Sequence, residues 1–340
     1  LQMDRRTFTK LIALLSLQSS RSLGEILKNP KIVVIGAGII GTMIAYELVK
    51  KGADVKIIDK EFPASGASGH SFSWINATYP KKPYEYNLLS QLGIDAYKSL
   101  ETEFNFDIRW NGSLEWFEND SQQEELFSEI NAIREYPTYT PVEIISFSQA
   151  QRMEPNTNFG DRKQIVHSLS DGAIDTIHAI QLINGEFERL GGESIFPCEF
   201  LKLNQQNGKL KSIDTNQGVI ETDYAIFACG IETDKNLGLN TLSTPTPGII
   251  LRSKPVESLF NKIIVGPGVH IHQQKNGAII LGEQDGAPLN HFDRLKKRPN
   301  KFPSKEFEEL HTERIMATAK NFTNGLESIE IEEVSIGWRP

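Results

Sequence analysis

Residues 31–59 are the segment that most constrains how this chain folds. A β-branched apolar run is followed by the motif GAGIIG at residues 36–41, by apolar residues at helical spacing, and by a second apolar run. Asp59 follows that second run directly. A glycine motif alone is weak evidence, but strand, turn, helix, strand and terminal acid in this order predict a βαβ unit that binds a dinucleotide.

Each glycine of the motif has a physical role in such a unit. Gly36 permits the tight turn out of the strand, Gly38 lets a pyrophosphate approach the backbone, and Gly41 lets the helix pack closely on the sheet. The helix N-terminus offers free N–H groups and the positive end of its dipole to the phosphates. Asp59 is placed to accept hydrogen bonds from a ribose, and an acid there favours FAD or NAD over NADP. The alternative is an ordinary βαβ unit with glycines in its turn.

Net charge and cysteine content argue against several classes of protein. The chain has 340 residues and a net charge of −8 without a visible basic stripe, which argues against nucleic acid as the main partner. Cys198 and Cys229 are too few for a disulfide framework and lie in apolar surroundings, so we expect buried thiols. The spacing of cysteine and histidine predicts no metal site, since His270 and His272 alone are weak evidence for one.

The first 25 residues resemble a twin-arginine export signal. Arg5 and Arg6 precede Phe8 and Lys10, and a short apolar run follows at residues 11–17. That run is too short to span a bilayer as a helix, so we expect no stable transmembrane segment there. The pattern predicts a periplasmic or otherwise exported protein. The alternative is an amphipathic N-terminal helix on a cytoplasmic protein.

The rest of the chain alternates between loops rich in small residues and strands. Residues 62–77 hold many small residues, which cannot fill a core and suit a loop that passes close to a large flat ligand. Residues 107–117 predict a hairpin that turns at Asn111-Gly112. A buried strand at 223–230 stops at a glycine, so the dinucleotide-binding half is interrupted and then resumed. Strands dominate from 242 to 332, which predicts an antiparallel sheet with helices on one side.

Together these pieces resemble the D-amino-acid oxidase superfamily of FAD-dependent oxidoreductases, which includes glycine oxidase, sarcosine oxidase and dimethylglycine dehydrogenase. The match rests on VVIGAGIIG with Asp59, the loop SGASGHSFSW, the stretch WNGSLEW, the segment from DGAIDT to GG, and AIFACG. The resemblance implies an α/β fold: a discontinuous Rossmann-like FAD-binding domain with an inserted α+β, antiparallel-sheet substrate domain. It assigns 31–79 and 145–236 to the FAD-binding domain and 80–144 and 237–335 to the substrate domain. Residues 336–340 would begin a C-terminal FAD-domain segment that this apparently truncated chain lacks.

The resemblance also implies which residues hold FAD. Those expected at the pyrophosphate are Gly36, Gly38, Ile39, Ile40 and Gly41. Those expected at the adenosine are Asp59, Lys60 and Phe200. Those expected along the phosphates and the flavin are Ala67, Ser68, Phe72, Ser73, Trp74 and Gly230. His70 matches a loop position where the dimethylglycine dehydrogenase branch bonds a histidine covalently to the flavin, and a flavin-adjacent histidine without that bond is the alternative.

The last residues resemble the G-x-R-P motif of the family, whose arginine, here Arg339, grips the substrate carboxylate. A guanidinium binds both carboxylate oxygens in one plane, and the alternative is an arginine in a surface ion pair. The resemblance implies oxidation of a small amine or amino acid (a D-amino acid, glycine or an N-methyl amino acid) by hydride transfer to flavin N5. Oxygen or a quinone would be the electron acceptor. The alternatives are an NAD-dependent dehydrogenase, which would share the first βαβ unit, and a non-catalytic truncated flavoprotein remnant.

Overall fold

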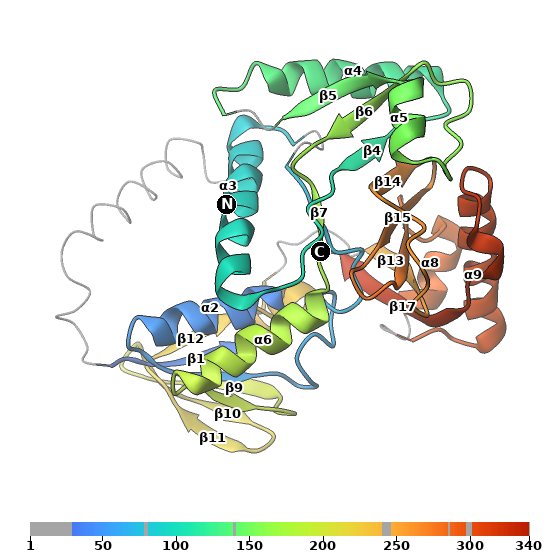
Figure 1. Ribbon diagram of the computed structural model, residues 1–340. Coiled ribbons are helices and arrows are strands. Elements are labelled where there is room, and N and C mark those ends of the chain that lie inside the picture. The colour runs from blue at the N-terminus through green and yellow to red at the C-terminus, as the bar shows by residue number, and fades with distance from the viewer. Residues whose placement is uncertain are drawn as a thin grey trace.

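The computed structural model describes residues 29–77, 81–138, 141–239, 246–284, 286–296 and 301–339. The described chain forms two lobes (Figure 1). One lobe is built on a four-stranded parallel sheet, and the other is built on an eight-stranded mixed sheet. The segment predicted to be a twin-arginine signal lies outside the described residues.

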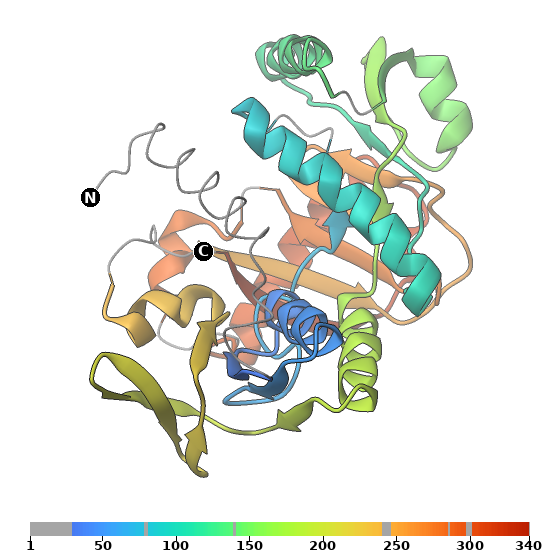
Figure 2. The same cartoon turned by 90° about the vertical axis from the view of Figure 1, so that its left-hand side faces the viewer.

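The parallel sheet has the strand order β12-β1-β2-β8. Its strands are β1 (Lys31–Ile35), β2 (Asp54–Ile58), β8 (Glu193–Ile195) and β12 (Tyr224–Phe227). β1 is buried at every position after Lys31, as expected for a parallel strand that is covered on both faces. Helices α2 (Ile39–Lys50) and α6 (Thr176–Arg189) lie side by side on one face (Figure 2). β12 pairs with β1, so strands from distant parts of the sequence complete one sheet.

A small antiparallel sheet covers part of the other face of the parallel sheet. Its strands are β9 (Phe200–Gln206), β10 (Lys209–Thr215) and β11 (Gly218–Glu221). Ile213 of β10 is fully buried and packs in one core with Val33, Ile35 and Ile58. The turns between these strands follow the glycines that the sequence places there, because Asn207 and Gly208 both have positive φ.

The larger sheet has the strand order β17-β13-β16-β15-β14-β4-β6-β5. Its strands are β4 (Ser113–Glu115), β5 (Val142–Ser146), β6 (Gln164–Ser168), β13 (Thr246–Ser253), β14 (Ile263–Gly266), β15 (Val269–Gln273), β16 (Ile279–Glu283) and β17 (Ile331–Arg339). Each pair of neighbours is antiparallel except β4 with β14.

The hairpin predicted at residues 107–117 is wrong. Only β4 forms there, and Ser113 pairs with Ser168 of β6 on one side and with Ile263 of β14 on the other. Gly112 does not turn the chain back on itself, since its carbonyl accepts a hydrogen bond from the N–H of Ile263. Pairing with distant strands overrides the local Asn-Gly signal and introduces one parallel pair into the predicted antiparallel sheet.

The two faces of the larger sheet have different coverings. One face carries the largest apolar core, which includes residues of α8 (Leu289–Lys296) and α9 (Lys305–Lys320). The opposite face carries the alternate residues of the same strands, and Glu115, Val265 and His270 lie there in one row across β4, β14 and β15. We call this side the inner face, because it contacts the loop that follows β2 of the parallel sheet.

The other described helices and short strands lie between and around the two sheets. They are β3 (Trp74–Ile75), α3 (Tyr84–Phe104), α4 (Asp120–Arg134), α5 (Phe147–Met153), β7 (Gly172–Ala173), η2 (Gly230–Glu232), α7 (Thr233–Leu237) and η3 (Leu326–Ser328). The end of α3 packs on the parallel lobe, where the ring of Phe104 meets that of Tyr46 edge to face at 5.1 Å. None of the helices in the described ranges is both long and apolar enough to cross a bilayer.

Candidate cofactor site

The glycine turn between β1 and α2 is too crowded for side chains. A methyl group added at Gly36, whose φ is +111°, would lie 2.4 Å from the carbonyl oxygen of Ala228. A methyl group at Gly41 would lie 1.9 Å from the carbonyl oxygen of Gly36, because the helix packs directly on the turn. At Gly38 it would lie 3.0 Å from the Ser68 hydroxyl oxygen. Glycine is therefore required at Gly36 and Gly41 for the turn itself, and at Gly38 it keeps the backbone exposed.

The N-terminus of α2 lacks a negative charge of its own. Gly38 is the N-cap and makes no side-chain hydrogen bond, and the first turn holds no acidic residue. The N–H of Ile39 donates to Ser68 Oγ at 3.0 Å, which is a neutral acceptor. Unneutralised N–H groups and the positive end of the helix dipole favour an anion at this place, and a phosphate fits that requirement.

The carboxylate of Asp59 is fixed by backbone N–H groups on either side of it. Asp59 Oδ2 accepts a hydrogen bond from the N–H of Ala37 at 2.8 Å, and Oδ1 accepts one from the N–H of Glu61 at 2.9 Å. Its own carbonyl accepts from the N–H of Cys198 at 2.5 Å, which ties β2 to the segment before β9. Each carboxylate oxygen keeps a second lone pair, so the group can still accept from a ribose hydroxyl.

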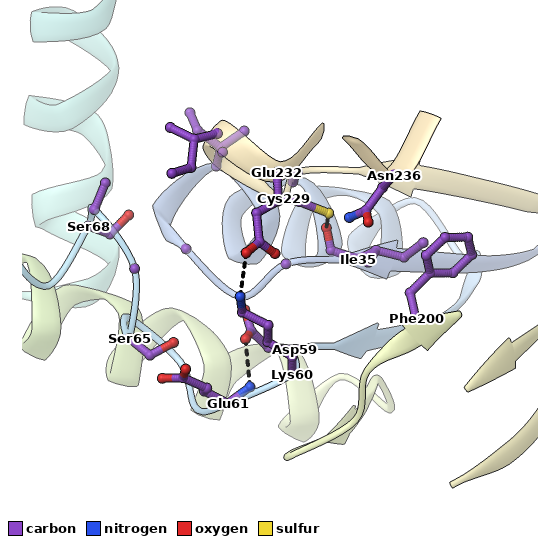
Figure 3. Close-up of a pocket in the computed structure, with 18 of the residues that line it drawn as sticks. Ile35, Asp59, Lys60, Glu61, Ser65, Ser68, Phe200, Cys229, Glu232 and Asn236 are labelled. Atoms are coloured by element: carbon purple, nitrogen blue, oxygen red, sulfur yellow. Dashed lines mark hydrogen bonds and ion pairs between the residues drawn. The ribbon is translucent and has the colours of Figure 1, made fainter. Parts of the chain in front are cut away.

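A cavity of about 440 Å³ opens above this turn, at the carboxyl edge of the parallel sheet (Figure 3). Open α/β sheets bind ligands at this edge. The residues that line the cavity are Ile35, Gly36, Gly38, Ile40, Asp59, Lys60, Glu61, Ser65, Gly66, Ala67, Ser68, Cys198, Glu199, Phe200, Ala228, Cys229, Gly230, Ile231, Glu232, Asn236 and Trp338.

An ion pair connects the ends of two strands of the parallel sheet at this cavity. Lys60 follows β2 and Glu232 lies in η2 after β12, and the Nζ and Oε1 atoms are 2.5 Å apart (Figure 3). Burial lowers the pKa of Lys60, but the hydrogen bond and the charge of Glu232 outweigh that effect, so the net shift of the pKa is upward. Lys60 therefore stays charged, and any ligand in the cavity lies beside this pair.

The two cysteines also lie at the cavity. Cys198 is buried, and Cys229 is half-buried and donates its thiol proton to the carbonyl of Ile35 at 3.2 Å. Burial raises the pKa of the Cys229 thiol, so this group stays protonated and unreactive at neutral pH.

The family description "FAD dependent oxidoreductase" (DAO) matches residues 31–340. The chain belongs to this family. At the cavity above the glycine turn, the uncapped helix N-terminus could hold a pyrophosphate and Asp59 could accept hydrogen bonds from a ribose. Membership of this family disfavours the alternative of an NAD-dependent dehydrogenase.

Known proteins of similar sequence cover different shares of this FAD dependent oxidoreductase. The bifunctional protein ThiO/ThiG of Trichormus variabilis is 23% identical over 274 residues, which are 74% of this chain and 39% of that protein. Glycine oxidase of Pseudomonas putida is 22% identical over 270 residues, 75% of this chain and 70% of that protein. Among solved structures, glycine oxidase from Geobacillus kaustophilus has a TM-score of 0.78 at 16% identity and covers 92% of this chain and 83% of that one. L-proline dehydrogenase from P. horikoshii has a TM-score of 0.72 at 20% identity, with 92% and 82% covered. At these identities the structures establish the shared fold.

Many of the residues predicted to hold FAD meet at the cavity. Those that line it are Gly36, Gly38, Ile40, Asp59, Lys60, Ala67, Ser68, Phe200 and Gly230. Ile39 and Gly41 lie in the first turn of α2, next to the cavity: the N–H of Ile39 donates to Ser68 Oγ, and Gly41 packs against Gly36. The structure thus brings the predicted pyrophosphate and adenosine residues together in one place.

The residues predicted to lie at the flavin occupy the next part of the same loop, between the cavity and the inner face. His70 Nε2 donates to the carbonyl of Ser65 at 3.2 Å, which folds the loop back on itself. Phe72 packs edge to face on His270 and His272, at centroid distances of 5.6 and 4.7 Å. Ser73 has a φ of +59°, and its hydroxyl lies 2.7 Å from that of Thr176 at the start of α6.

Two other predicted site residues, Arg339 and Trp74, lie in β17 and β3. Arg339 ends β17, where its backbone is paired with Thr246 of β13. The indole Nε1 of Trp74 donates to Asp171 Oδ2 at 2.9 Å, and the Ser113 hydroxyl donates to the same oxygen at 2.7 Å. A buried acid is therefore part of the wall that Trp74 forms against the inner face.

Glu115 is a second buried acid on the inner face. It is 4% exposed, and its Oε1 has no hydrogen-bond partner in the described chain. Burial, together with the charges of Asp171 and Glu129, raises the pKa of Glu115 to about 8. Glu115 is therefore mostly protonated at neutral pH.

Several residues of the cavity were not predicted from the sequence, among them Glu232, Asn236 and Trp338. For Glu232 a signal was available: it follows β12, and the carboxyl ends of parallel strands meet at one edge of a sheet. Trp338 reaches the cavity through β17 and the fold of the other lobe, and no local pattern marks that approach.

Proposed function

We propose that this chain binds FAD in the cavity of Figure 3 and oxidises a small amine or amino acid, such as a D-amino acid, glycine or an N-methyl amino acid. The observation that carries the proposal is the glycine turn, uncapped helix and fixed Asp59 at one edge of the parallel sheet. Relatives named glycine oxidase, D-amino acid dehydrogenase and 4-methylaminobutanoate oxidase support the substrate class.

Different residues of the cavity would bind different parts of FAD. The exposed backbone at Gly38 and the first N–H groups of α2 would hold the pyrophosphate, and Asp59 would accept hydrogen bonds from the ribose. When bound, FAD supplies the hydride acceptor. The protein then has to orient the substrate, exclude water and supply charges that suit the reaction.

Substrate would lie against the inner face of the larger sheet, beside the loop of Phe72 and Trp74. Arg339 is at the end of β17, two strands from β16, and a guanidinium there would bind a substrate carboxylate through both oxygens. No dedicated general base is needed, because a neutral amine can release hydride directly while its nitrogen lone pair stabilises the product.

The test begins with the absorbance spectrum of the purified protein before and after acid precipitation. Bands at roughly 370 and 450 nm identify oxidised flavin, and colour that moves to the supernatant means that His70 is not covalently attached. The protein is then mixed without oxygen with a panel of amino acids and amines, and bleaching of the 450 nm band identifies substrates. A protein that binds FAD but is bleached by none of them contradicts the proposed substrate class.

Arg339 is tested by comparing amino acids with the matching amines that lack a carboxylate. Replacement by methionine should raise KM for the amino acid at least about 10-fold while leaving the amine unaffected, since a bidentate pair contributes a few kcal/mol. Arg339→Lys keeps the charge but not the fork, so it should recover only part of the loss. Equal effects on both substrates would place Arg339 outside the substrate site.

We also propose that the protein is exported by the twin-arginine route and that oxygen or a quinone reoxidises the flavin. The paired Arg5 and Arg6 support export. Replacing both with lysine in the producing cell should retain the protein in the cytoplasm, as measured by fractionation. The rate of flavin reoxidation by oxygen, compared with that by a soluble quinone, decides the acceptor.

A further inference from the structure

The loop that lines the FAD cavity continues until it meets the larger sheet. Its first part, with Ser68, contacts the N-terminus of α2, and its last part, with Phe72, contacts β15 and β16. The sheet approaches this last part closely. A methyl group at Gly337 would lie 2.1 Å from the carbonyl oxygen of His70, and one at Gly282 would lie 3.2 Å from the ring of Phe72.

One side chain of the sheet holds this loop by a hydrogen bond. His272 of β15 is 1% exposed, and its Nε2 lies 2.7 Å from the carbonyl oxygen of Phe72. A carbonyl oxygen only accepts, so Nε2 carries the proton and Nδ1 is bare; Nδ1 has no hydrogen-bond partner in the described chain. The imidazole ring also packs edge to face on the ring of Phe72.

The surroundings keep His272 neutral. Its pKa is lowered to about 4, chiefly by burial and also by the charges of Arg109 and Arg252. The hydrogen bond to Phe72 and the charge of Asp175 oppose this shift without cancelling it. The ring therefore keeps one proton throughout the physiological range, and the hydrogen bond to the loop fixes where that proton is.

We propose that His272 is a positioning residue, which fixes the loop of residues 65–74 against the substrate sheet and thereby sets how tightly FAD is held. The inference rests on the proposed FAD binding. His272 would act on FAD through the loop. Ser68, in the first part of the loop, contacts the N-terminus of α2, and Phe72, in the last part, is hydrogen-bonded to the sheet. A hydrogen bond from a fully buried donor restricts the loop to one conformation before the cofactor arrives.

The chain offers a matched control on the opposite side of the same sheet. His311 of α9 is 0% exposed, and burial lowers its pKa to about 4 as well. Its hydrogen-bond partners are His291 and Arg314, and it packs in the core away from the cavity. Replacing either histidine removes a buried imidazole, but only His272 contacts the loop.

The experiment uses His272→Gln, His272→Asn and His311→Asn. The amide nitrogen of glutamine can reach the position of Nε2, while that of asparagine is one carbon shorter. FAD is removed from each purified protein and added back, and its affinity is followed by quenching of flavin fluorescence, together with the visible circular dichroism of the bound flavin. His272→Asn should weaken FAD roughly 10-fold and change the dichroism, His272→Gln should restore most of both, and His311→Asn should match wild type.

Each outcome bears on the inference. If His272→Asn folds and binds FAD with wild-type affinity and dichroism, or if His311→Asn weakens FAD as much, then His272 is not a positioning residue. Wild-type protein that does not bind FAD would overturn the proposed function instead. Should the variants not fold, the ¹⁵N chemical shifts of histidine-labelled wild-type protein show which ring nitrogen of His272 carries the proton. A proton on Nδ1 overturns the inference, and a proton on Nε2 both without and with FAD supports it.

Discussion

Asp59 Oδ2 accepts a hydrogen bond of 2.8 Å from the backbone N–H of Ala37, so the acid after β2 is joined to the glycine turn after β1. The two elements that the βαβ motif assigns to ribose and pyrophosphate are thus connected before any ligand binds. The second oxygen is held by the N–H of Glu61. This arrangement fixes the rotamer of the carboxylate, which lowers the entropy lost when a ribose binds.

Replacing Asp59 with alanine should weaken FAD binding about 10- to 100-fold, because a hydrogen bond to a charged group contributes ~1.5–3 kcal/mol. Fluorescence titration of the apoprotein measures this. Asp223 is the control: its carboxylate accepts from the N–H of Lys31 at 3.0 Å, at the opposite edge of the same sheet. Asp223→Ala should leave the affinity unchanged. If both variants lose affinity alike, the cause is the stability of the lobe and not a contact with the ribose.

Gly41→Ala should destabilise the protein and abolish tight FAD binding. The new methyl group would lie 1.9 Å from the carbonyl oxygen of Gly36 and 3.2 Å from the Cβ of Ala228. Neither neighbour is the end of a flexible side chain that could move away, so we expect a loss of about 3 kcal/mol. Chemical denaturation measures the free energy of unfolding. Gly185 of α6 is exposed and its added methyl group meets nothing within 4 Å, so Gly185→Ala should stabilise by up to about 1 kcal/mol. A stable Gly41→Ala variant that binds FAD would contradict the close packing.

The Lys60–Glu232 pair should slow the release of FAD. Removing either charge should increase the dissociation rate about 2- to 5-fold, and the exchanged pair K60E/E232K should restore most of the wild-type rate, since exposed ion pairs contribute ~0.2–1 kcal/mol. Added salt should reduce the difference. Lys31 and Glu221 form an ion pair outside the cavity, with 2.9 Å between Nζ and Oε2. The exchanged pair K31E/E221K should therefore leave the dissociation rate of FAD unchanged. An exchanged pair that behaves like the single variants would show that Lys60 acts on the ligand by itself.

The sequence predicted the dinucleotide-binding unit because its signals are local. The strands at Lys31–Ile35 and Asp54–Ile58 and the intervening helix each follow from periodicity and from glycines within one stretch of chain. The acid Asp59 is in that stretch too. The turn needs no information from distant residues, apart from the close approach of Ala228 to Gly36.

Strand pairing and contacts between segments far apart in the chain could not be predicted from local sequence signals. Ser113 of β4 pairs in parallel with Ile263, a choice that the Asn-Gly signal beside it opposes. The hydrogen bond between His272 and the carbonyl of Phe72 also joins segments far apart in the chain. The alternation of side chains along β15 indicates only that His270 and His272 share a face of the strand. Which face of the sheet contacts the loop of residues 65–74 depends on the order of the strands, and the periodicity of the sequence does not predict that order.

Glu115 should make the protein less stable as pH rises. Its pKa in the folded protein is raised from 4.5 to about 8 by burial and by Asp171 and Glu129, so between these values the unfolded chain releases a proton that the folded chain keeps. Stability is therefore fully present below about pH 4.5 and is lost as the pH rises toward 8. Glutamine at this position carries no such penalty. Glu115→Gln should stabilise by on the order of 3 kcal/mol at pH 8 and by much less at pH 5, measured by denaturation at both values. Glu124 of α4 is exposed, and Glu124→Gln should have little effect at either pH. An equal gain from Glu115→Gln at pH 5 and pH 8 would mean that Glu115 does not titrate in this range, and that packing alone causes the gain.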